Sequence, residues 1–416
     1  MRCSANIIGI CGIEYLQKTQ KDAKDHEKNK LSATRLVFIM PWFCIVGWYF
    51  CSTINFETLV TFFEIMTCNI SFNIRELAVD FGTANTRVMY HDEIVLEESS
   101  AIMIDSESGG LLLLGNDAAG CPDGGMGKNH VVWPLADGVI GDFQAFGQMV
   151  EGFLHIVNGR IPIPLKVAAS VPIGLTEVEE RFVCDVLKKA GAVDVQLIYG
   201  PLAAAIGIGL DVMGPEAKMI VDIGGGTSEI SVISSGDIVQ MAAIKTAGDV
   251  FTRDIEDYIR QIPGMENGSR MAEQVKIHVG AAIRDIPDVL APFELSNYNL
   301  ANPKTIWVTH DEVADVLDNS IGRIETIVMT VLNSTTPKVL DDISRSGIHL
   351  VGGGALLRGL DKRLHLMTGL PVHVAEDPLH AVVRGTSVAL RNFDRFSFFG
   401  EMNLMEDWRK SGIFAD

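Results

Sequence analysis

Hydrophobic and polar positions alternate along two distant stretches of the chain. Residues 76–88 and residues 218–233 both tend to alternate apolar and polar side chains, on either side of a glycine-containing turn. A period of two is typical of β-strands, because successive side chains point to opposite faces of a sheet. Each stretch is therefore predicted to form a β-hairpin.

Between the two hairpins the pattern changes to a helical one. In residues 177–190 the apolar side chains recur with the spacing of one helix face, at Val178, Phe182, Val183, Val186 and Leu187. Thr176 precedes this run and Glu179 stands three positions later, which together predict a capping box at the start of the helix. The chain is therefore predicted to contain both strands and helices.

Composition fits a globular α/β protein and excludes several other classes. The 416 residues are 47% hydrophobic and 21% charged, which is enough for a sizeable core divided between two lobes. The net charge of −19 argues against a nucleic-acid partner, because such binding depends on neutralising phosphates. The 7 cysteines form no CxxC pair and no cluster with histidine, so we expect no zinc site and a reduced, cytoplasmic setting.

Both predicted hairpins enclose a glycine turn that follows an aspartate. Residues 80–86 read DFGTANT and residues 222–227 read DIGGGT. Glycine lets main-chain N–H groups approach a phosphate without a Cβ in the way, and an aspartate at the end of the first strand can hold Mg²⁺ through water. One such turn is weak evidence of nucleotide binding, because aspartate and glycine are common in ordinary turns. The pair predicts a clamp for ATP.

A third glycine run, LVGGGALLRGL at residues 350–360, has a strand pattern before it and a helix pattern after it. Bare backbone at the start of a helix suits a ribose or a base packed against it, whereas an ordinary strand-to-helix turn is the alternative.

Together these motifs resemble the MreB family of bacterial rod-shape proteins, within the actin-like ATPase superfamily. The resemblance rests on residues 80–86, 137–140, 203–207, 222–227, 352–361 and 369–379, and it extends from about residue 75 to residue 399. It implies an α/β fold in which a ribonuclease-H-like unit is duplicated, with a nucleotide cleft between two lobes. Lobe I would hold residues 74–214 and 385–400, and lobe II residues 215–384. Residues 1–73 form an atypical extension, and residues 401–416 a short tail.

The resemblance also implies roles for individual residues. Asp80 and Asp222 would face Mg²⁺ through water. The backbone of two turns would hold the phosphates of ATP, through Thr83, Ala84, Asn85, Gly225, Gly226 and Thr227. Ribose and adenine would meet Glu273, Gln274, Val275 and Lys276 on one side and Gly353, Gly354, Ala355 and Leu356 on the other. Without the resemblance, residues 273–276 are typical of the polar face of an amphipathic helix.

One position departs from the family pattern. The resemblance implies a glutamate directly before Pro201, where its carboxylate positions or deprotonates the water that attacks the γ-phosphate, but this chain has Gly200. Loss of such a group typically lowers the rate by about 10²–10⁴-fold, so we expect tight binding of Mg-ATP and slow hydrolysis. Thr227 and Asp142 are the candidates for replacing it. A sequence error at Gly200 in an otherwise active protein is the alternative.

Filament formation follows from the resemblance as well. The family assembles head to tail into paired protofilaments at the inner face of the cytoplasmic membrane, where they guide the proteins of cell-wall elongation. Ile161, Ile163 and Leu165 alternate with other residues between Arg160 and Lys166, at the position of the family's membrane-inserting loop. A buried edge strand explains the same alternation.

Other functional classes fit less well. The sequence has no signature of a sugar kinase, and the 16 residues after residue 400 are too few for the peptide-binding domain of a heat-shock chaperone. A hydrolysis-deficient relative that forms persistent filaments, or modulates active ones, is the main alternative because of Gly200.

The extension raises a question of topology. Residues 36–56 carry no charged side chain and are long enough to cross a bilayer as a helix, and residues 58–72 are a shorter apolar stretch that contains Glu64. The basic residues between 18 and 35 would stay in the cytoplasm, so a single crossing would place the ATP site outside the cell. A hairpin of two segments, a segment in the membrane surface and a misassigned start codon are the three explanations.

Overall fold

The computed structural model describes residues 74–121, 128–159, 163–263, 265, 269–286, 291–297, 304–392 and 414–415. The predicted membrane segment 36–56, the stretch 58–72 and most of the tail lie outside these residues. Among the described helices, none combines the length and the apolar character needed to span a bilayer. The described residues belong to one compact unit, Asn73–Asp416.

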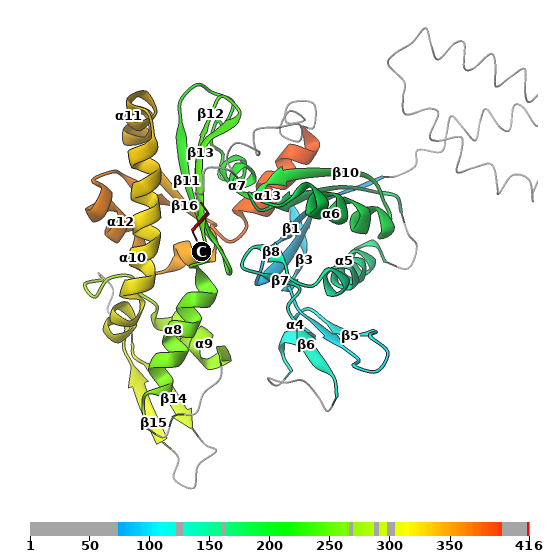
Figure 1. The fold of residues 1–416 in the computed structure, drawn as a ribbon, viewed down its shortest axis with the longest axis horizontal. Helices are drawn as coiled ribbons and strands as arrows, with labels where there is room; N and C mark the ends of the chain where they lie inside the picture. Colours follow the sequence, from blue (N-terminus) through cyan, green and yellow to red (C-terminus); the bar gives the residue numbers. More distant parts are fainter. Residues whose placement is uncertain are drawn as a thin grey trace, which may run out of the picture. The chain divides into compact units, whose positions relative to one another are not determined.

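The first sheet has the strand order β10-β9-β1-β2-β3. Its strands are β1 (Arg75–Phe81), β2 (Asn85–Tyr90), β3 (Glu93–Ser99), β9 (Leu165–Val171) and β10 (Ala192–Tyr199). The first three strands pair antiparallel, whereas β9 and β10 run parallel to β1. Helices α5 (Phe143–Asn158) and α6 (Glu177–Lys189) pack against this sheet (Figure 1).

The second sheet repeats this connectivity. Its order is β17-β16-β11-β12-β13-β18, from the strands β11 (Lys218–Ile223), β12 (Ser228–Ser234), β13 (Asp237–Ile244), β16 (Ile348–Val351), β17 (Val372–Val374) and β18 (Phe414–Ala415). Strands β11, β12 and β13 pair antiparallel, and β16 runs parallel to β11. The hairpins β1–β2 and β11–β12 are thus equivalent parts of a duplicated unit, as the two turns predicted.

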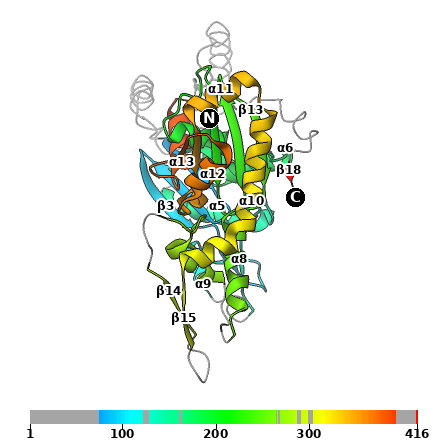
Figure 2. The same ribbon diagram turned by 90° about the vertical axis from the view of Figure 1, so that its left-hand side faces the viewer.

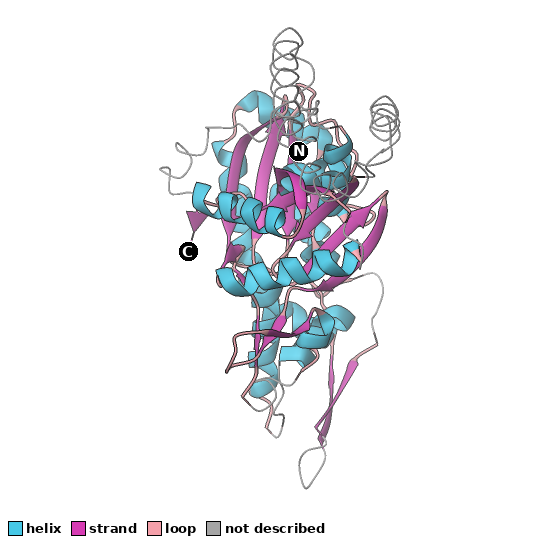
Figure 3. Ribbon diagram, turned by 90° about the vertical axis from the view of Figure 1, so that its right-hand side faces the viewer, coloured by secondary structure: helices cyan, strands magenta, loops and turns pink. Residues whose placement is uncertain are grey.

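Helices and small sheets surround this frame. The second sheet is accompanied by α8 (Gly248–Arg260), α9 (Ser269–Val279), α10 (His310–Ser334), α11 (Pro337–Ser346), η1 (Gly353–Leu356) and α12 (Leu360–Thr368). Beside the first sheet lie β4 (Ile102–Ile104), β5 (Leu111–Leu114), α4 (Asn116–Ala119), β6 (His130–Val132), β7 (Leu135–Ala136) and β8 (Val139–Ile140). The hairpin of β14 (Phe293–Asn297) and β15 (Lys304–Val308) projects away from the second sheet (Figure 3).

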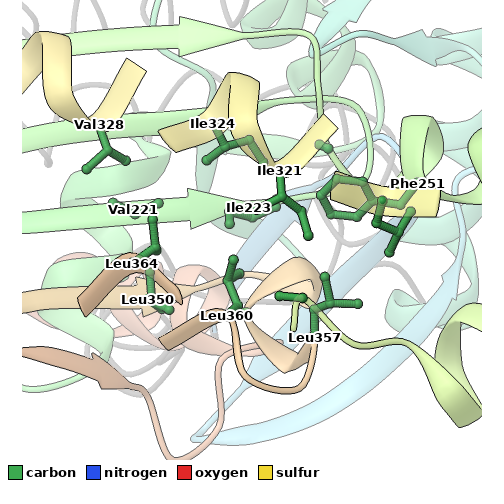
Figure 4. Packing of buried hydrophobic residues seen from close by; sticks show 14 of the residues in the cluster. Val221, Ile223, Phe251, Ile321, Ile324, Val328, Leu350, Leu357, Leu360 and Leu364 are labelled. Atoms are coloured by element: carbon green, nitrogen blue, oxygen red, sulfur yellow. The ribbon is translucent and has the colours of Figure 1, made fainter. Parts of the chain in front are cut away.

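The core of the second half is formed between its sheet and its helices. Val221 and Ile223 of β11 and Leu350 of β16 are fully buried, and Figure 4 shows them beside residues of α10 and α12. Helix α10 runs along the sheet that contains β13 (Figure 2). Each large aliphatic side chain buried here stabilises the fold by roughly 1.5–3 kcal/mol relative to an exposed position. This packing holds the end of β11, and therefore Asp222, in a fixed position.

Two helices lie between the sheets (Figure 1). Helix α7 (Gly200–Gly207) and helix α13 (Ala381–Arg391) share a buried cluster with residues of both sheets. They approach so closely that a Cβ on Gly207 would lie 1.8 Å from the carbonyl oxygen of Ala381. The two halves of the molecule are therefore joined through a backbone-to-backbone helix contact.

The predicted capping box is present at the start of α6. The Thr176 backbone N–H donates to Oε2 of Glu179 at 2.7 Å, and the Glu179 N–H donates to Oγ1 of Thr176 at 3.3 Å. These bonds satisfy backbone donors that a helix start leaves unpaired. The local pattern alone was enough to locate this helix.

The proposed membrane loop needs a correction at Leu165. Leu165 begins β9, pairs with Arg75 in the register of the first sheet, and is fully buried in the core. It cannot insert into a membrane while the sheet is folded, so the alternating pattern here reflects a buried strand. Ile163 is partly buried and its backbone is hydrogen-bonded to the Asn158 side chain, whereas Ile161 lies outside the described residues.

Candidate functional site

A large cavity lies where the two sheets' hairpin turns meet. Its volume is about 1520 Å³, and its walls come from both halves of the duplicated unit. Among the predicted site residues, the following line it: Asp80, Thr83, Ala84, Asn85, Gly200, Asp222, Gly225, Gly226, Thr227, Glu273, Lys276, Gly353, Gly354 and Leu356. Segments that are far apart in the sequence are therefore brought together around one space.

The two glycine turns face each other directly. A Cβ on Gly225 would lie 2.9 Å from the Cβ of Ala84, and a Cβ on Gly226 would lie 2.8 Å from Oγ1 of Thr83. Real Cβ atoms do not tolerate such separations, so both positions require glycine for this approach. The result is a pair of exposed backbone turns whose N–H groups can converge on a single anion.

A third turn, next to the two glycine turns, also lines the cavity. Asp137 and Gly138 connect β7 and β8, and both have positive φ values, 51° and 75°, as a two-residue hairpin turn requires. A Cβ on Gly138 would lie 2.7 Å from Cγ2 of Thr227. The DG sequence of this turn therefore allows close packing against the second glycine turn.

The two aspartates lie at equivalent ends of β1 and β11. Oδ1 of Asp80 accepts a hydrogen bond from the Ser170 hydroxyl at 2.7 Å, and Nη1 of Arg87 lies 4.0 Å from Oδ2 of Asp80. Burial raises the pKa of Asp80 in spite of these partners. Burial, and next the negative charge of Asp80, raises the pKa of Asp222 to about 7. Two carboxylates that repel each other in a buried place are a suitable environment for a cation.

The donor set fits a magnesium ion held through water. Within the part of the chain that the structure describes, no group of three or more His, Cys, Asp or Glu side chains is arranged to hold a metal directly. Asp80 and Asp222 alone would leave most of an octahedral shell to water and to phosphate oxygens, which is the usual way that Mg²⁺ is bound beside a nucleotide.

Behind Asp80 a chain of charged groups extends across the first sheet. Nε of Arg87 donates to Oε1 of Glu97 at 2.8 Å, and Nε2 of His380 lies 3.4 Å from the same oxygen. His380 also contacts Asp377 at 2.8 Å through Nδ1. Because His380 directly precedes α13, this network connects the first glycine turn with the helix pair between the sheets.

Two of the four residues on α9 that were predicted to meet ribose and adenine, Glu273 and Lys276, line the cavity. Nζ of Lys276 donates to the Gly248 carbonyl at 2.9 Å and to the Thr252 hydroxyl at 2.8 Å, and it pairs with Glu273 at 2.7 Å. These polar groups line the cavity. Gln274 and Val275 do not, because Gln274 is exposed and Val275 is fully buried in the core. The prediction was therefore wrong for Gln274 and Val275.

The third glycine run lies beside the end of β11. A Cβ on Gly352 would lie 2.4 Å from Oδ1 of Asp222, and one on Gly354 would lie 2.1 Å from Cγ2 of Ile223. Gly353, Gly354 and Leu356 line the cavity, whereas Ala355 points into the core and does not. The 3₁₀ turn of η1 alternates its contacts in this way, which corrects the prediction for Ala355.

Asp142 does not reach the site. It is the N-cap of α5, where its Oδ1 accepts a hydrogen bond from the Ala145 N–H at 2.9 Å, and it is absent from the residues that line the cavity. Its place in the sequence, four residues after Gly138, was misleading because the side chain satisfies the start of the next helix. Thr227 lies in the cavity wall, as expected.

Sequence reasoning missed several carboxylates in the cavity lining, and Glu229 is the one that lies opposite Asp222. Glu229 is 7% exposed, lines the cavity, and pairs with Asp222 in the β11–β12 register. Burial, and next the charge of Asp222, raises the pKa of Glu229 to about 8. The available signal was its position, because Glu229 stands seven residues after Asp222 just as Arg87 stands seven residues after Asp80.

Comparisons with known proteins agree with this geometry. The sequence model described as MreB/Mbl protein matches residues 74–397. The cell shape-determining protein Mbl of Bacillus subtilis (strain 168) is 36% identical over 324 residues, which are 77% of this chain and 97% of the relative. The cell shape-determining protein MreB of Escherichia coli (strain K12) is 37% identical over 329 residues, covering 77% and 94% of the two chains.

Solved structures give the same result for the fold. The crystal structure of MreB5 of Spiroplasma citri bound to AMPPNP has a TM-score of 0.71 and 31% identity, and covers 78% of this chain and 98% of that one. A MamK double helical filament has a TM-score of 0.64 at 19% identity, covering 77% and 99%. The predicted duplicated α/β fold of the actin-like type is confirmed.

Proposed function

Because this chain belongs to the MreB/Mbl family, we propose that it is an ATP-binding, actin-like cytoskeletal protein that polymerises into filaments and determines cell shape. The relatives named above are cell shape-determining proteins, and the similar MamK structure is a filament. The observation that carries the proposal is the meeting of two glycine turns, from two copies of one hairpin, around a single cavity.

Mg-ATP is the proposed ligand of this cavity. The similar MreB5 structures hold AMPPNP and ADP, and the cavity here offers backbone N–H groups for phosphates and two partly buried aspartates for a hydrated Mg²⁺. Lys276 and Glu273, which line the same cavity, would meet the ribose or the base. When bound, Mg²⁺ would supply positive charge beside the phosphates, and the glycine turns would hold them in place through main-chain donors.

Hydrolysis by this site is proposed to be slow. Gly200 lies in the cavity wall at the start of α7 and brings no side chain to the place where the family resemblance implies a glutamate. Backbone turns do not need that side chain to bind phosphate, so affinity and hydrolysis are separable properties here. Persistent filaments of a hydrolysis-deficient family member are the second candidate function, and Gly200 is the observation that favours it.

The proposed partners are other copies of this chain, the inner face of the cytoplasmic membrane and the proteins of cell-wall elongation. Self-assembly is supported by the filament-forming structural neighbour. A membrane contact would involve Ile161 and Ile163 without Leu165, because Leu165 is buried. The protein would act in the cytoplasm, where ATP is available.

Electron microscopy of the purified chain tests the filament proposal. We expect filaments with Mg-ATP and with Mg-AMPPNP, and no filaments without nucleotide. The variant Gly226→Val serves as a control that should not bind nucleotide, because the added side chain would collide with Thr83 across the cavity. Filaments that form equally well without any nucleotide, or no filaments at all, would contradict the proposal. The lifetime of the filaments after ATP is removed separates the two candidate functions.

A further inference from the structure

We propose that Glu229 supplies the carboxyl oxygen that orients the attacking water in this chain, in place of the side chain that Gly200 lacks. This inference rests on the proposed function as an ATP-binding protein. If Glu229 has this role, residual ATP hydrolysis depends on a side chain of β12 and not on residue 200 at the start of α7.

The distance between the two positions carries the argument. A Cβ built on Gly200 would lie 4.0 Å from Oε2 of Glu229 and 3.7 Å from the Val171 carbonyl oxygen. A glutamate at position 200 would place its carboxyl group beyond its Cβ by two further bonds, so it could reach the space next to Glu229. Both residues line the same cavity, together with Asp222 and Thr227.

Within the part of the chain that the structure describes, Glu229 lacks ion contacts of the kind that Arg87 has in the equivalent hairpin. Arg87 and Glu229 occupy equivalent positions, opposite Asp80 and Asp222 in their hairpin registers. Arg87 is held by ion contacts to Glu97 and Asp80. Glu229 receives a hydrogen bond from the Ile173 backbone N–H, and no ion pair to it is found among the described residues. A buried carboxyl group with spare acceptor capacity at a cavity wall is suited to hold a water molecule.

The reaction step balances with the groups at hand. The water oxygen forms a bond to the γ-phosphorus, while the bond from that phosphorus to the β–γ bridging oxygen breaks and its electron pair leaves with ADP. The protons of the water end on inorganic phosphate and in solvent. Glu229 accepts a hydrogen bond from the water and fixes its orientation. Either protonation state of a carboxyl group retains an oxygen that can accept such a bond.

The test compares single-turnover phosphate release by the full chain with its affinity for Mg-AMPPNP. In Glu229→Leu we expect phosphate release to fall at least about tenfold, with the AMPPNP dissociation constant unchanged within about threefold. In the double variant Gly200→Glu with Glu229→Leu, we expect the rate to return to at least the parental value. Ser231→Ala is the matched control, two positions along the same strand and outside the cavity lining, and its rate should stay unchanged.

Three results would overturn the inference. The first is phosphate release by Glu229→Leu at the parental rate. The second is a loss of AMPPNP binding in Glu229→Leu that Gly200→Glu does not restore in the double variant. The third is a parental chain that binds AMPPNP but releases no phosphate above the level of buffer alone. A parental chain that binds no nucleotide would instead refute the proposed function. The two failures are therefore distinguishable in one set of experiments.

Discussion

Gly385 of α13 packs directly on Ala203 of α7, so that a Cβ on Gly385 would lie 1.6 Å from the Ala203 carbonyl oxygen. The contact is reciprocal, because Gly207 of α7 approaches the carbonyl of Ala381 in the same way. Both helices lie in the buried cluster that joins the two sheets. The relative position of the two glycine turns therefore depends on a helix crossing that only glycine permits.

Substitution at this crossing should destabilise the protein. For Gly385→Ala we expect a loss of about 3 kcal/mol or more in the free energy of unfolding, because neither backbone can yield without moving a helix. Urea denaturation followed by circular dichroism measures this change. Gly147→Ala is the matched control, because Gly147 lies in α5 and its added Cβ would meet only Cγ2 of Val186, at 3.9 Å. The control should gain about 0.5–1 kcal/mol. Equal stability of the two variants would contradict the tight crossing.

The buried carboxyl groups predict how stability depends on pH. Burial raises the pKa of Asp222 from 3.8 to about 7 and that of Glu229 from 4.5 to about 8. The folded state therefore retains protons that the unfolded chain has already released, and the contribution of these groups is largest below about pH 4 and is lost as the pH rises to about 8.

Urea denaturation of the nucleotide-free chain at about pH 6 and about pH 8.5 measures this dependence. We expect the free energy of unfolding to be at least about 1 kcal/mol lower at the higher pH. The variant Asp222→Asn, which cannot ionise, should show a smaller decrease. A cation at the site would favour the ionised aspartates, so the stabilisation by Mg-nucleotide should grow over the same range. A free energy of unfolding that rises with pH in the nucleotide-free chain would refute the assignment.

Substitutions can distinguish the structural role of Leu165 in β9 from a membrane contact made by the residues before it. Leu165→Ala should lower the free energy of unfolding by about 2–5 kcal/mol, because Leu165 is fully buried. Ile163→Ser should cost less than about 1.5 kcal/mol, since Ile163 is only partly buried. If the proposed membrane contact exists, Ile163→Ser combined with Ile161→Ser should reduce cosedimentation of filaments with anionic lipid vesicles. Unchanged cosedimentation would show that Ile161 and Ile163 do not make the proposed membrane contact.

Restoring the missing side chain should accelerate hydrolysis. We expect Gly200→Glu to release phosphate about tenfold faster than the parental chain, because the added carboxylate would enter the cavity beside Glu229 and Thr227. Its affinity for Mg-AMPPNP should change little, since the phosphates are proposed to be held by backbone. A steady-state phosphate assay measures the rate. Equal rates in the two proteins would refute the proposed deficit.

The two hairpins and their glycine turns could be predicted because the information is local and is repeated. Asp80 and Asp222 each end a strand before a glycine turn, and two copies of one pattern imply two copies of one unit. The capping box at Thr176 is equally local. In such cases the residues that make the contact are also close together in the sequence.

Other parts of the site depend on contacts that spacing does not encode. The spacing from Asp222 to Glu229 can be read in the sequence, but it needed the register of β11 and β12 to show that Glu229 lies opposite Asp222. Asp142 was misassigned because its closeness to Gly138 in the sequence does not show which way its side chain points. In the structure its carboxylate caps α5. Leu165 fitted an exposed alternating loop and a buried strand equally well, and only its pairing beside Arg75 decided between them.

Isothermal titration of the purified full chain with ATP in the presence of magnesium tests the central claim most directly. The opposed glycine turns predict one bound nucleotide per chain, with binding lost in Gly226→Val and retained in Gly147→Ala. Absence of binding heat in a chain that circular dichroism shows to be folded would contradict the account, as would undiminished binding in Gly226→Val.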